Sequence, residues 1–245
     1  MAEFCLRIAG HTAAIRSLFD SAPDFLRAYV TEETPAFSIA VTPEDLVQEQ
    51  ELALEEARLE GFRIRYFPDP FLERAVIQRK FADFLFQKQI LLFHGSALAL
   101  DGNGYLFTAR SGTGKSTHTR YWRESFPGRV QMINDDKPFL DLGQTPIQMY
   151  GSPWSGKHGL DTNICVPLKG LCILERGTEN RIHPVSAEEA LPMLSKQAHC
   201  PLNTPDPECH RKLVHTLALS IPLWHMTCTK SPEAALVAAQ AMTEI

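Results

Sequence analysis

The chain has 245 residues, of which 44% are hydrophobic and 22% are charged, and its formal net charge is -5. This balance is sufficient for one globular core with a smaller appendage, and it argues against binding to nucleic acid or to an anionic membrane. No basic segment followed by a long apolar run opens the sequence, and no apolar run reaches the length of a bilayer span. We therefore expect a cytoplasmic protein whose six cysteines are reduced thiols.

The first 88 residues predict an α/β segment that carries no recognisable motif. A strand over 36–41 leads to Thr42, which is an N-cap followed by proline at the first helical position, and a charged helix runs to about Glu60. Apolar residues at helical spacing predict a second helix over 71–87. We assign residues 1–88 to an N-terminal α/β preamble packed on the core, and residues 89–245 to the core itself.

In the core, predicted strands alternate with helices. A buried strand over 90–95 precedes two strands within 96–109, which are joined at 101–104 by Asp-Gly-Asn-Gly, a strong hairpin signal. Further elements follow in chain order: a helix to about Ser125, strands over 129–134 and 168–177, a helix behind the capping box of Ser186 and Glu189, and a helix from about Ser231. Because a hairpin is antiparallel, the predicted fold class is α/β with a mixed sheet flanked by helices.

A Pro-rich segment near the C-terminus is bounded by His199 and Cys200 on one side and by Cys209 and His210 on the other. All four side chains are of types that bind zinc. However, adjacent ligands suit a single tetrahedral site poorly, and the usual paired spacings are missing. A surface loop between two helices is therefore the favoured interpretation, and metal binding remains the alternative.

Residues 108–117, TARSGTGKST, resemble a phosphate-binding loop in which Ala109 replaces the usual first glycine. In such a loop, backbone N–H groups surround the phosphate oxygens, and the next helix directs its positive end at them. Lys115 neutralises the β- and γ-phosphates, and the Ser116 hydroxyl binds magnesium. We predict ATP and Mg²⁺ as cofactors. The predicted nucleotide-binding residues are Arg110, Ser111, Gly112, Thr113, Gly114, Lys115, Ser116 and Thr117.

Two adjacent carboxylates, Asp135 and Asp136, follow the predicted strand over 129–134. Enzymes with a phosphate loop need a carboxylate at such a strand end to hold magnesium. Neighbouring residues of an extended chain point to opposite sides, so one carboxylate can face the metal while the other faces an attacking hydroxyl as general base. A solvated turn is the alternative, and the presence of the loop favours the functional interpretation.

The stretch FHGSALALDGNGYLFTARSGTGKS, followed by INDD, resembles the catalytic domain of HPr kinase/phosphorylase. That family has a His-Gly on a strand, a hairpin, an S-G-x-G-K-S loop and an Asp-Asp after the next strand. The resemblance covers roughly residues 90–180. It implies the P-loop fold of the phosphoenolpyruvate carboxykinase group, and a kinase-like catalytic core over 89–245.

The resemblance also implies a role for each matching residue. Lys115 contacts the β- and γ-phosphates, Ser116 and Asp136 hold magnesium, and Asp135 takes the proton from a substrate hydroxyl. His94 lies near the transferring phosphate, where it orients Asp135 or an attacking group. Without the resemblance, a single histidine in this position is better explained as a hydrogen-bonded core residue.

Two departures from the family pattern weigh against HPr as substrate and against phosphorylase activity. The family has a glutamate directly after the loop serine, where this chain has Thr117, and a later acidic segment, where this chain has MYGSPWSGKHG without an acid. This segment is a polar loop bounded by glycines. If it closes over the substrate, Lys157 adds positive charge at the transition state, and a plain surface turn is the alternative.

We predict a magnesium-dependent kinase that transfers the γ-phosphate of ATP to a hydroxyl, with serine of a protein or peptide as the favoured acceptor. The alternatives are a kinase of a small metabolite with the same chemistry and a non-catalytic ATP-binding sensor. Two aspartates argue against the sensor, because binding alone needs no base. The sequence does not fix the acceptor, a reverse phosphorylase activity or the oligomeric state, although related enzymes often form homo-oligomers.

Overall fold

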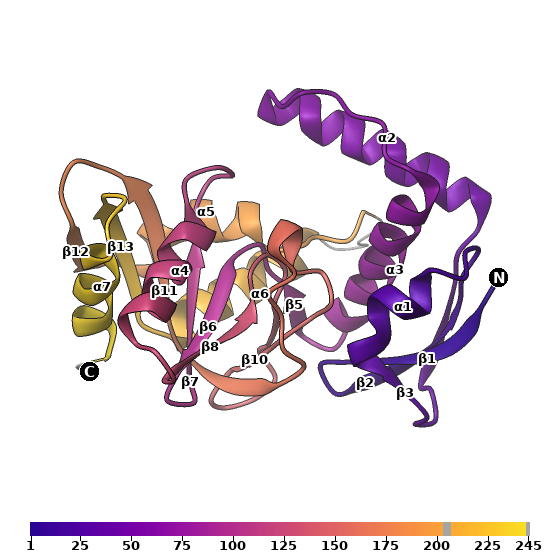
Figure 1. Ribbon diagram of the computed structural model, residues 1–245, viewed down its shortest axis with the longest axis horizontal. Helices are drawn as coiled ribbons and strands as arrows, with labels where there is room; N and C mark the ends of the chain where they lie inside the picture. Colours follow the sequence, from indigo (N-terminus) through magenta and orange to yellow (C-terminus); the bar gives the residue numbers. More distant parts are fainter. Residues whose placement is uncertain (203–206, 244–245) are drawn as a thin grey trace. The chain divides into compact units, whose positions relative to one another are not determined.

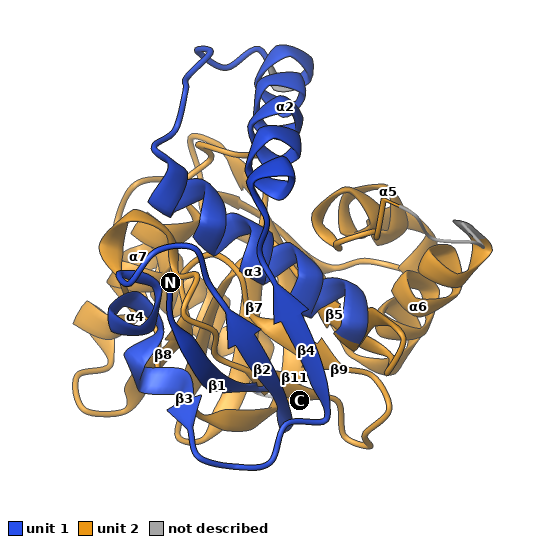
Figure 2. Cartoon of the chain, turned by 90° about the vertical axis from the view of Figure 1, so that its right-hand side faces the viewer, with its two compact units in different colours: residues 1–84 blue, residues 85–245 orange. Residues whose placement is uncertain are grey.

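The computed structural model describes residues 1–202 and 207–243. The chain divides into two compact units, residues 1–84 and 85–245, which Figure 2 shows in separate colours. Unit 1 contains a four-stranded sheet in the order β3-β1-β2-β4, in which only the pair β2–β4 is parallel. Its elements are β1 Glu3–Ile8, β2 His11–Arg16, α1 Ala22–Leu26, η1 Arg27–Tyr29, β3 Val30–Thr31, β4 Phe37–Ala40, α2 Pro43–Glu60 and most of α3, Asp69–Phe86.

Helix α2 begins where the sequence predicts. The Thr42 side chain accepts a hydrogen bond from the Asp45 N–H at 3.3 Å, and the Asp45 carboxylate accepts from the Thr42 N–H at 2.8 Å. This capping box satisfies two N–H groups at the start of the helix. The helix ends at Gly61, whose φ of 69° is a left-handed conformation that glycine adopts without strain. The predictions of α2 and of the following helix α3 are confirmed.

Unit 2 contains the larger sheet, in which the order β5-β9-β10-β11-β7-β6-β8 is extended by β13 beside β11 and β12 beside β13. Its elements are β5 Ile90–Leu92, β6 Ser96–Leu100, β7 Asn103–Thr108, α4 Lys115–Ser125, β8 Val130–Asn134, β9 Phe139–Asp141, β10 Gln148–Tyr150, η2 Gly156–His158, β11 Cys165–Arg176, β12 Arg181–Pro184, α5 Ala187–Gln197, α6 Pro207–Ser220, β13 Leu223–Cys228 and α7 Glu233–Thr243. Strand β7 is antiparallel to β6 and parallel to β11, so the predicted mixed sheet is confirmed.

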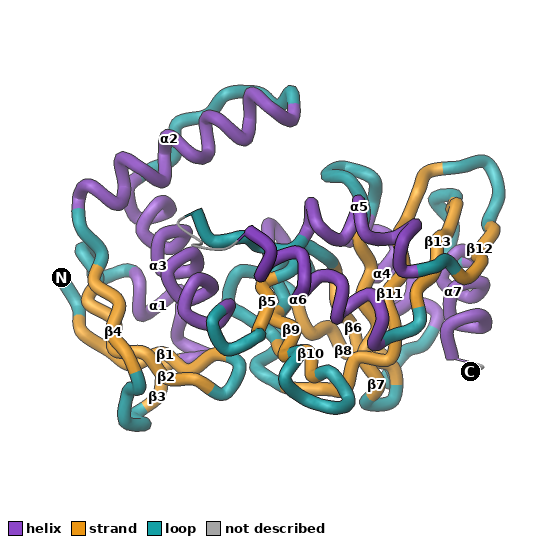
Figure 3. Tube along the Cα trace, turned by 180° about the vertical axis from the view of Figure 1, so that it is seen from behind, coloured by secondary structure: helices purple, strands orange, loops and turns teal. Residues whose placement is uncertain are grey.

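Helices cover both faces of this sheet (Figures 1 and 3). On one face, α5 and α6 pack with Leu194, Val214 and Leu217 into a core shared with β7 and β11. On the other face, α4 and α7 pack with Trp122 and Ala238 into a second core. Burial of these apolar surfaces on two sides explains the nearly continuous apolar runs of the central strands.

The hairpin between β6 and β7 turns at Asp101 and Gly102, one residue earlier than the centre of the predicted turn. Their φ angles of 49° and 79° are both positive, as a two-residue hairpin turn of this hand requires. Gly104 instead belongs to β7. A side chain there would approach the Pro167 carbonyl oxygen to 3.0 Å and the Met149 side chain to 2.8 Å, so close strand packing accounts for this glycine.

Candidate functional site

Most of the predicted site residues come from the ends of three strands in unit 2, and Lys157 lies in η2. Strands β7 and β8 are both antiparallel to β6, which lies between them, so they run in the same direction. The phosphate loop follows β7 and the aspartate pair follows β8, and both therefore emerge at the same edge of the sheet. His94 follows β5, and its N–H donates to the Gln197 carbonyl at 2.8 Å.

The loop has the backbone that its glycines predict. Gly112 and Gly114 have φ angles of 77° and 123°, where a side chain would introduce strain, and α4 begins directly afterwards at Lys115. Ala109 is fully buried in the core beneath α4, and its φ is not positive. Alanine is therefore compatible with the position at which glycine was expected.

Lys115 is only 8% exposed, and its Nζ donates to the Ala109 carbonyl at 3.3 Å. Burial lowers the pKa of this ammonium group, and the nearby Asp136 and Asp135 act in the opposite direction. The loop thus presents a partly desolvated cation at the start of a helix. This combination of a positive side chain and a helix N-terminus suits a polyphosphate.

Asp135 is buried and tied to the structure beneath the loop. The Ser96 hydroxyl donates to its carboxylate at 2.5 Å and lies 2.9 Å from the hydroxyl of Thr119 on α4. The Asp135 N–H donates to the Leu160 carbonyl at 3.0 Å. Ser96, which the sequence analysis did not single out, therefore links the first carboxylate to the helix that carries the phosphate loop.

Asp136 is about one third exposed and pairs with His94 at 3.2 Å between Oδ1 and Nε2. Burial is the largest influence on Asp136 and acts to raise its pKa. The hydrogen bond from His94 and the positive charge of Lys137 outweigh burial, so the pKa lies below its usual value. Burial lowers the pKa of His94, which keeps the ring neutral at pH 7 with Nε2–H directed at Asp136.

The turn that presents both carboxylates is built around Asn134. Its side-chain oxygen accepts from the N–H groups of Asp136 and Lys137 at 2.7 and 2.5 Å, and its amide donates to the Ser152 carbonyl at 2.7 Å. Gly156 packs against Asp136 so closely that an added side chain would lie 3.3 Å from the Asp136 Cβ. The polar loop that contains Lys157 is thereby held over the aspartate pair.

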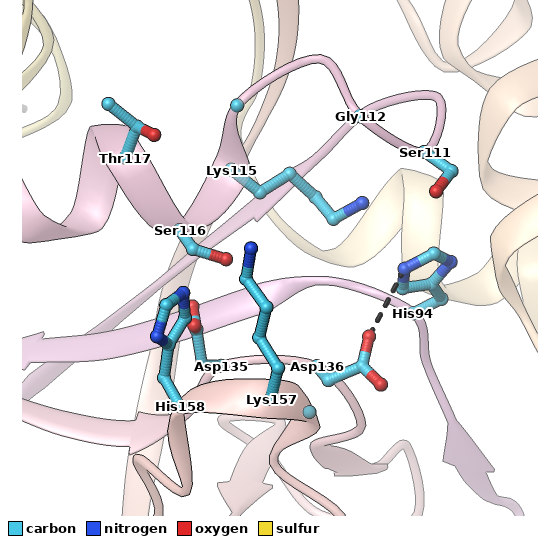
Figure 4. Close-up of a pocket in the computed structure, with 12 residues that line it drawn as sticks. His94, Ser111, Gly112, Lys115, Ser116, Thr117, Asp135, Asp136, Lys157 and His158 are labelled. Carbon is cyan, nitrogen blue, oxygen red and sulfur yellow. Dashed lines mark ion pairs between the residues drawn. The ribbon is translucent and has the colours of Figure 1, made fainter.

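A pocket of about 530 Å³ brings most of the predicted residues together. Figure 4 shows Lys115, Ser116 and Lys157 around its centre, with Asp135 beneath Ser116 and Asp136 beside His94. The lining residues are His94, Ser111, Gly112, Gly114, Lys115, Ser116, Thr117, Asp135, Asp136, Gly156, Lys157 and His158. The Ser116 hydroxyl and the two carboxylates are the oxygen ligands that magnesium prefers.

Two predicted loop residues lie elsewhere, and one further residue joins the pocket. Arg110 and Thr113 do not line the pocket, and they line a second cavity of about 800 Å³ together with Ser111 and Gly112. His158, to which the sequence analysis gave no separate role, lines the pocket beside Asp135 (Figure 4). Its only sequence signal was its position in the polar loop.

Of the four candidate zinc ligands near the C-terminus, Cys209 and His210 lie in α6. The His210 ring is 3.2 Å from the Ala198 carbonyl oxygen and stacks on Phe86. Residues 203–206 of this segment lie outside the described residues. Within the described ranges, no group of three or more His, Cys, Asp or Glu side chains is arranged to hold a metal ion.

Comparison with known proteins gives structural likenesses and no sequence match. No family model matches the chain, and no curated protein is similar to it. A solved structure of the HPr(Ser) kinase/phosphatase from Coxiella burnetii aligns with 62% of this chain and 94% of its own length, with 14% sequence identity and a TM-score of 0.35. A likeness of this size says nothing about the activity of this chain.

Among the helices of the described residues, none has both the length and the apolar composition needed to cross a bilayer.

Proposed function

We propose that the chain is a magnesium-dependent phosphotransferase that moves the γ-phosphate of ATP to a hydroxyl group. One observation carries this proposal: a single pocket contains a glycine-rich loop with its lysine at a helix N-terminus, two carboxylates from the end of β8, and a histidine hydrogen-bonded to one of them. A binding site alone would need only the loop. The carboxylate and histidine pair adds a group that can accept a proton.

The loop side of the pocket supports binding of the triphosphate. Backbone N–H groups at Gly112 and Gly114 and the start of α4 would contact phosphate oxygens, while Lys115 and the exposed Lys157 would offset the charge that develops on the transferring group. Ser116 and a neighbouring carboxylate would hold Mg²⁺, which would supply further neutralisation of the phosphate charge.

The contacts favour roles for the two aspartates that are the reverse of the roles expected from the sequence. Asp135 is 5% exposed, accepts a hydrogen bond from Ser96 and lies beneath Ser116, which suits a magnesium ligand. Asp136 is more exposed and borders the open part of the pocket with His94, which suits a general base. In this assignment, His94 orients Asp136 rather than Asp135.

The acceptor would approach from the open side of the pocket, where its hydroxyl can reach Asp136 and the end of the triphosphate together. The carboxylate takes the hydroxyl proton as the oxygen attacks phosphorus in line with the leaving ADP. A serine side chain of a protein or peptide remains the favoured acceptor because of the motif resemblance to HPr kinase/phosphorylase and the carboxykinase fold group. A small metabolite is the alternative.

The first test is transfer of labelled γ-phosphate in an extract of the native cell, with the products separated into polypeptide and small-molecule fractions. Label on a polypeptide that survives acid and is removed by alkali identifies a serine or threonine kinase, whereas label in the other fraction identifies a metabolite kinase. Lys115→Ala is the matched negative variant. ATP affinity that is unchanged in this variant would contradict the phosphate-loop assignment.

A second test separates the two aspartates. Asp135→Asn is expected to raise the magnesium concentration needed for ATP binding, because it removes a metal ligand. Asp136→Asn is expected to leave that concentration unchanged and to reduce transfer. The opposite pattern would restore the division of roles expected from the sequence. If both variants transfer phosphate at the normal rate, the catalytic proposal fails.

A further inference from the structure

Arg176 contacts the phosphate loop from the side that faces away from the pocket. Its Nε donates to the Thr113 carbonyl at 3.1 Å, and its Nη2 donates to the Gly112 carbonyl. Arg176 does not line the pocket that contains Lys115, and it lines the second cavity, whose wall includes the same loop residues. The guanidinium group is therefore placed to bind loop carbonyls rather than a phosphate in the pocket.

Sheet register brings Arg176 to this position. Strand β11 is parallel to β7, with Ile173 paired to Thr108, so the end of β11 lies beside the start of the loop. The adjoining Gly177 donates its N–H to the Cys228 carbonyl at 3.0 Å, and an added side chain there would lie 2.0 Å from Thr227. The close approach of β13 thus fixes the backbone that carries Arg176.

The two hydrogen bonds from Arg176 also set the directions of the loop N–H groups, because each carbonyl shares a rigid peptide plane with the following N–H. In a trans peptide, the C=O and the following N–H point in opposite directions. A Thr113 carbonyl held towards Arg176 therefore directs the Gly114 N–H away from it, and a Gly112 carbonyl held in the same way directs the Thr113 N–H away. The Thr113 N–H donates to the Arg110 carbonyl at 3.2 Å, which closes a turn in this conformation.

We propose that Arg176 is a positioning residue that holds the phosphate loop in its anion-binding conformation before the nucleotide arrives. This inference rests on the proposed function, because it assigns the loop to a phosphate. A fork of two donors satisfies two carbonyls at once and keeps their negative ends away from the pocket. The loop is then already ordered in the unliganded protein. Less conformational entropy is lost when ATP binds, and ATP therefore binds more tightly.

The test is calorimetric titration of wild type, Arg176→Ala and Arg176→Lys with a non-hydrolysable ATP analogue and Mg²⁺. Arg176→Ala is expected to weaken binding by about tenfold to a hundredfold, as loss of one or two charge-assisted hydrogen bonds would. Arg176→Lys should recover little, because one ammonium group does not reproduce the fork. Arg181→Ala is the matched control, since Arg181 is exposed at the start of β12 and forms an ion pair with Glu179, and it should bind as wild type does.

Chemical rescue separates positioning from a general effect of charge. Guanidinium chloride at millimolar, non-denaturing concentration should strengthen binding to Arg176→Ala, because the second cavity admits the ion beside the Gly112 and Thr113 carbonyls. Sodium chloride at equal ionic strength should not. In the nucleotide-free protein, amide hydrogen exchange over 110–117 should be faster in Arg176→Ala than in wild type.

Several results would overturn the proposal. Wild-type affinity in Arg176→Ala, full recovery in Arg176→Lys, or an absence of guanidinium rescue would each remove the positioning role. Lys115→Ala distinguishes failure of the Arg176 inference from failure of the proposed function. If Lys115→Ala loses ATP binding while Arg176→Ala keeps it, only this inference fails. If Lys115→Ala keeps ATP binding, the proposed function fails and the inference fails with it.

Discussion

In unit 1, a buried acid bonds to the backbone of its own unit, whereas in unit 2 a buried acid belongs to a connected set of polar side chains that leads to the pocket. Two buried carboxylates illustrate the difference. Glu73 is fully buried and accepts hydrogen bonds from the Leu18 and Phe19 N–H groups at the end of β2. Asp135 accepts from Ser96 and also lines the pocket.

This comparison shows that burial of an acid does not by itself mark a functional site. Burial is the largest influence on Glu73 and raises its pKa, although the two N–H donors oppose the rise. A buried acid that completes a turn is explained by the turn. A buried acid that shares a pocket with a lysine, a serine and a second acid requires a different explanation, which the phosphotransferase proposal supplies.

The largest expected effect is on the rate of phosphate transfer, which should depend on the acid of unit 2 and not on the acid of unit 1. Asp136→Asn should reduce phosphate transfer by about 10²- to 10⁴-fold, the range typical of a lost general base. Glu73→Gln keeps a side-chain oxygen for the Leu18 and Phe19 N–H groups and should leave the transfer rate unchanged. Rates are measured with labelled ATP under identical conditions. Equal losses of transfer rate in both variants would show that the two acids do not differ in function.

A substitution in the core beneath the phosphate loop should lower the stability of the protein strongly. Trp122 is fully buried against Phe107 and Tyr105, and its indole N–H donates to His118 at 3.0 Å. Trp122→Ala should lower the free energy of unfolding by about 3–5 kcal/mol. Leu59→Ala, at a side chain of unit 1 that is 80% exposed, should change it by less than about 0.5 kcal/mol. Denaturant titrations give both values.

Because His118 is buried, we expect the folded protein to lose stability in acid. Burial lowers its pKa from 6.5 to about 4, because the charged ring is poorly solvated. Above pH 6.5, the ring is neutral in both the folded and the unfolded states. As the pH falls from 6.5 to 4, the unfolded state takes up the proton first, and stability falls by up to about 3 kcal/mol.

His118→Gln removes this titration and should flatten the dependence of stability on pH between 4 and 6.5. The measurement is the free energy of unfolding at a series of pH values for both proteins. A parallel dependence in the variant and in wild type would show that His118 does not cause the loss.

The smallest expected effects should be alike in the two units. Thr42 with Asp45 in unit 1 and Ser186 with Glu189 in unit 2 form the same reciprocal capping box. Thr42→Ala and Ser186→Ala should each lower the free energy of unfolding by about 1 kcal/mol, because capping is a local interaction. ATP affinity should be unchanged in both variants. A loss of affinity in Ser186→Ala alone would indicate that α5 contributes to the site.

Several elements could be predicted because their signals are local. The cap at Thr42, the turn after β6, the start of α4 and the capping box at Ser186 each depend on a few consecutive residues. The strand pair β1–β2 and the strands β9, β10, β12 and β13 were not predicted. Strands of this kind are short or irregularly patterned, and long-range pairing with a neighbour decides whether they form.

The sequence by itself determined the phosphate-loop backbone, the identity of the acids after β8 and the α/β class, because glycine conformations and periodicity act within a few residues. Only the tertiary structure decided that His94 pairs with Asp136, that Ser96 bonds to Asp135, and that Arg176 contacts the loop. These residues come from different strands. Their distances depend on sheet order and register, which no local pattern encodes.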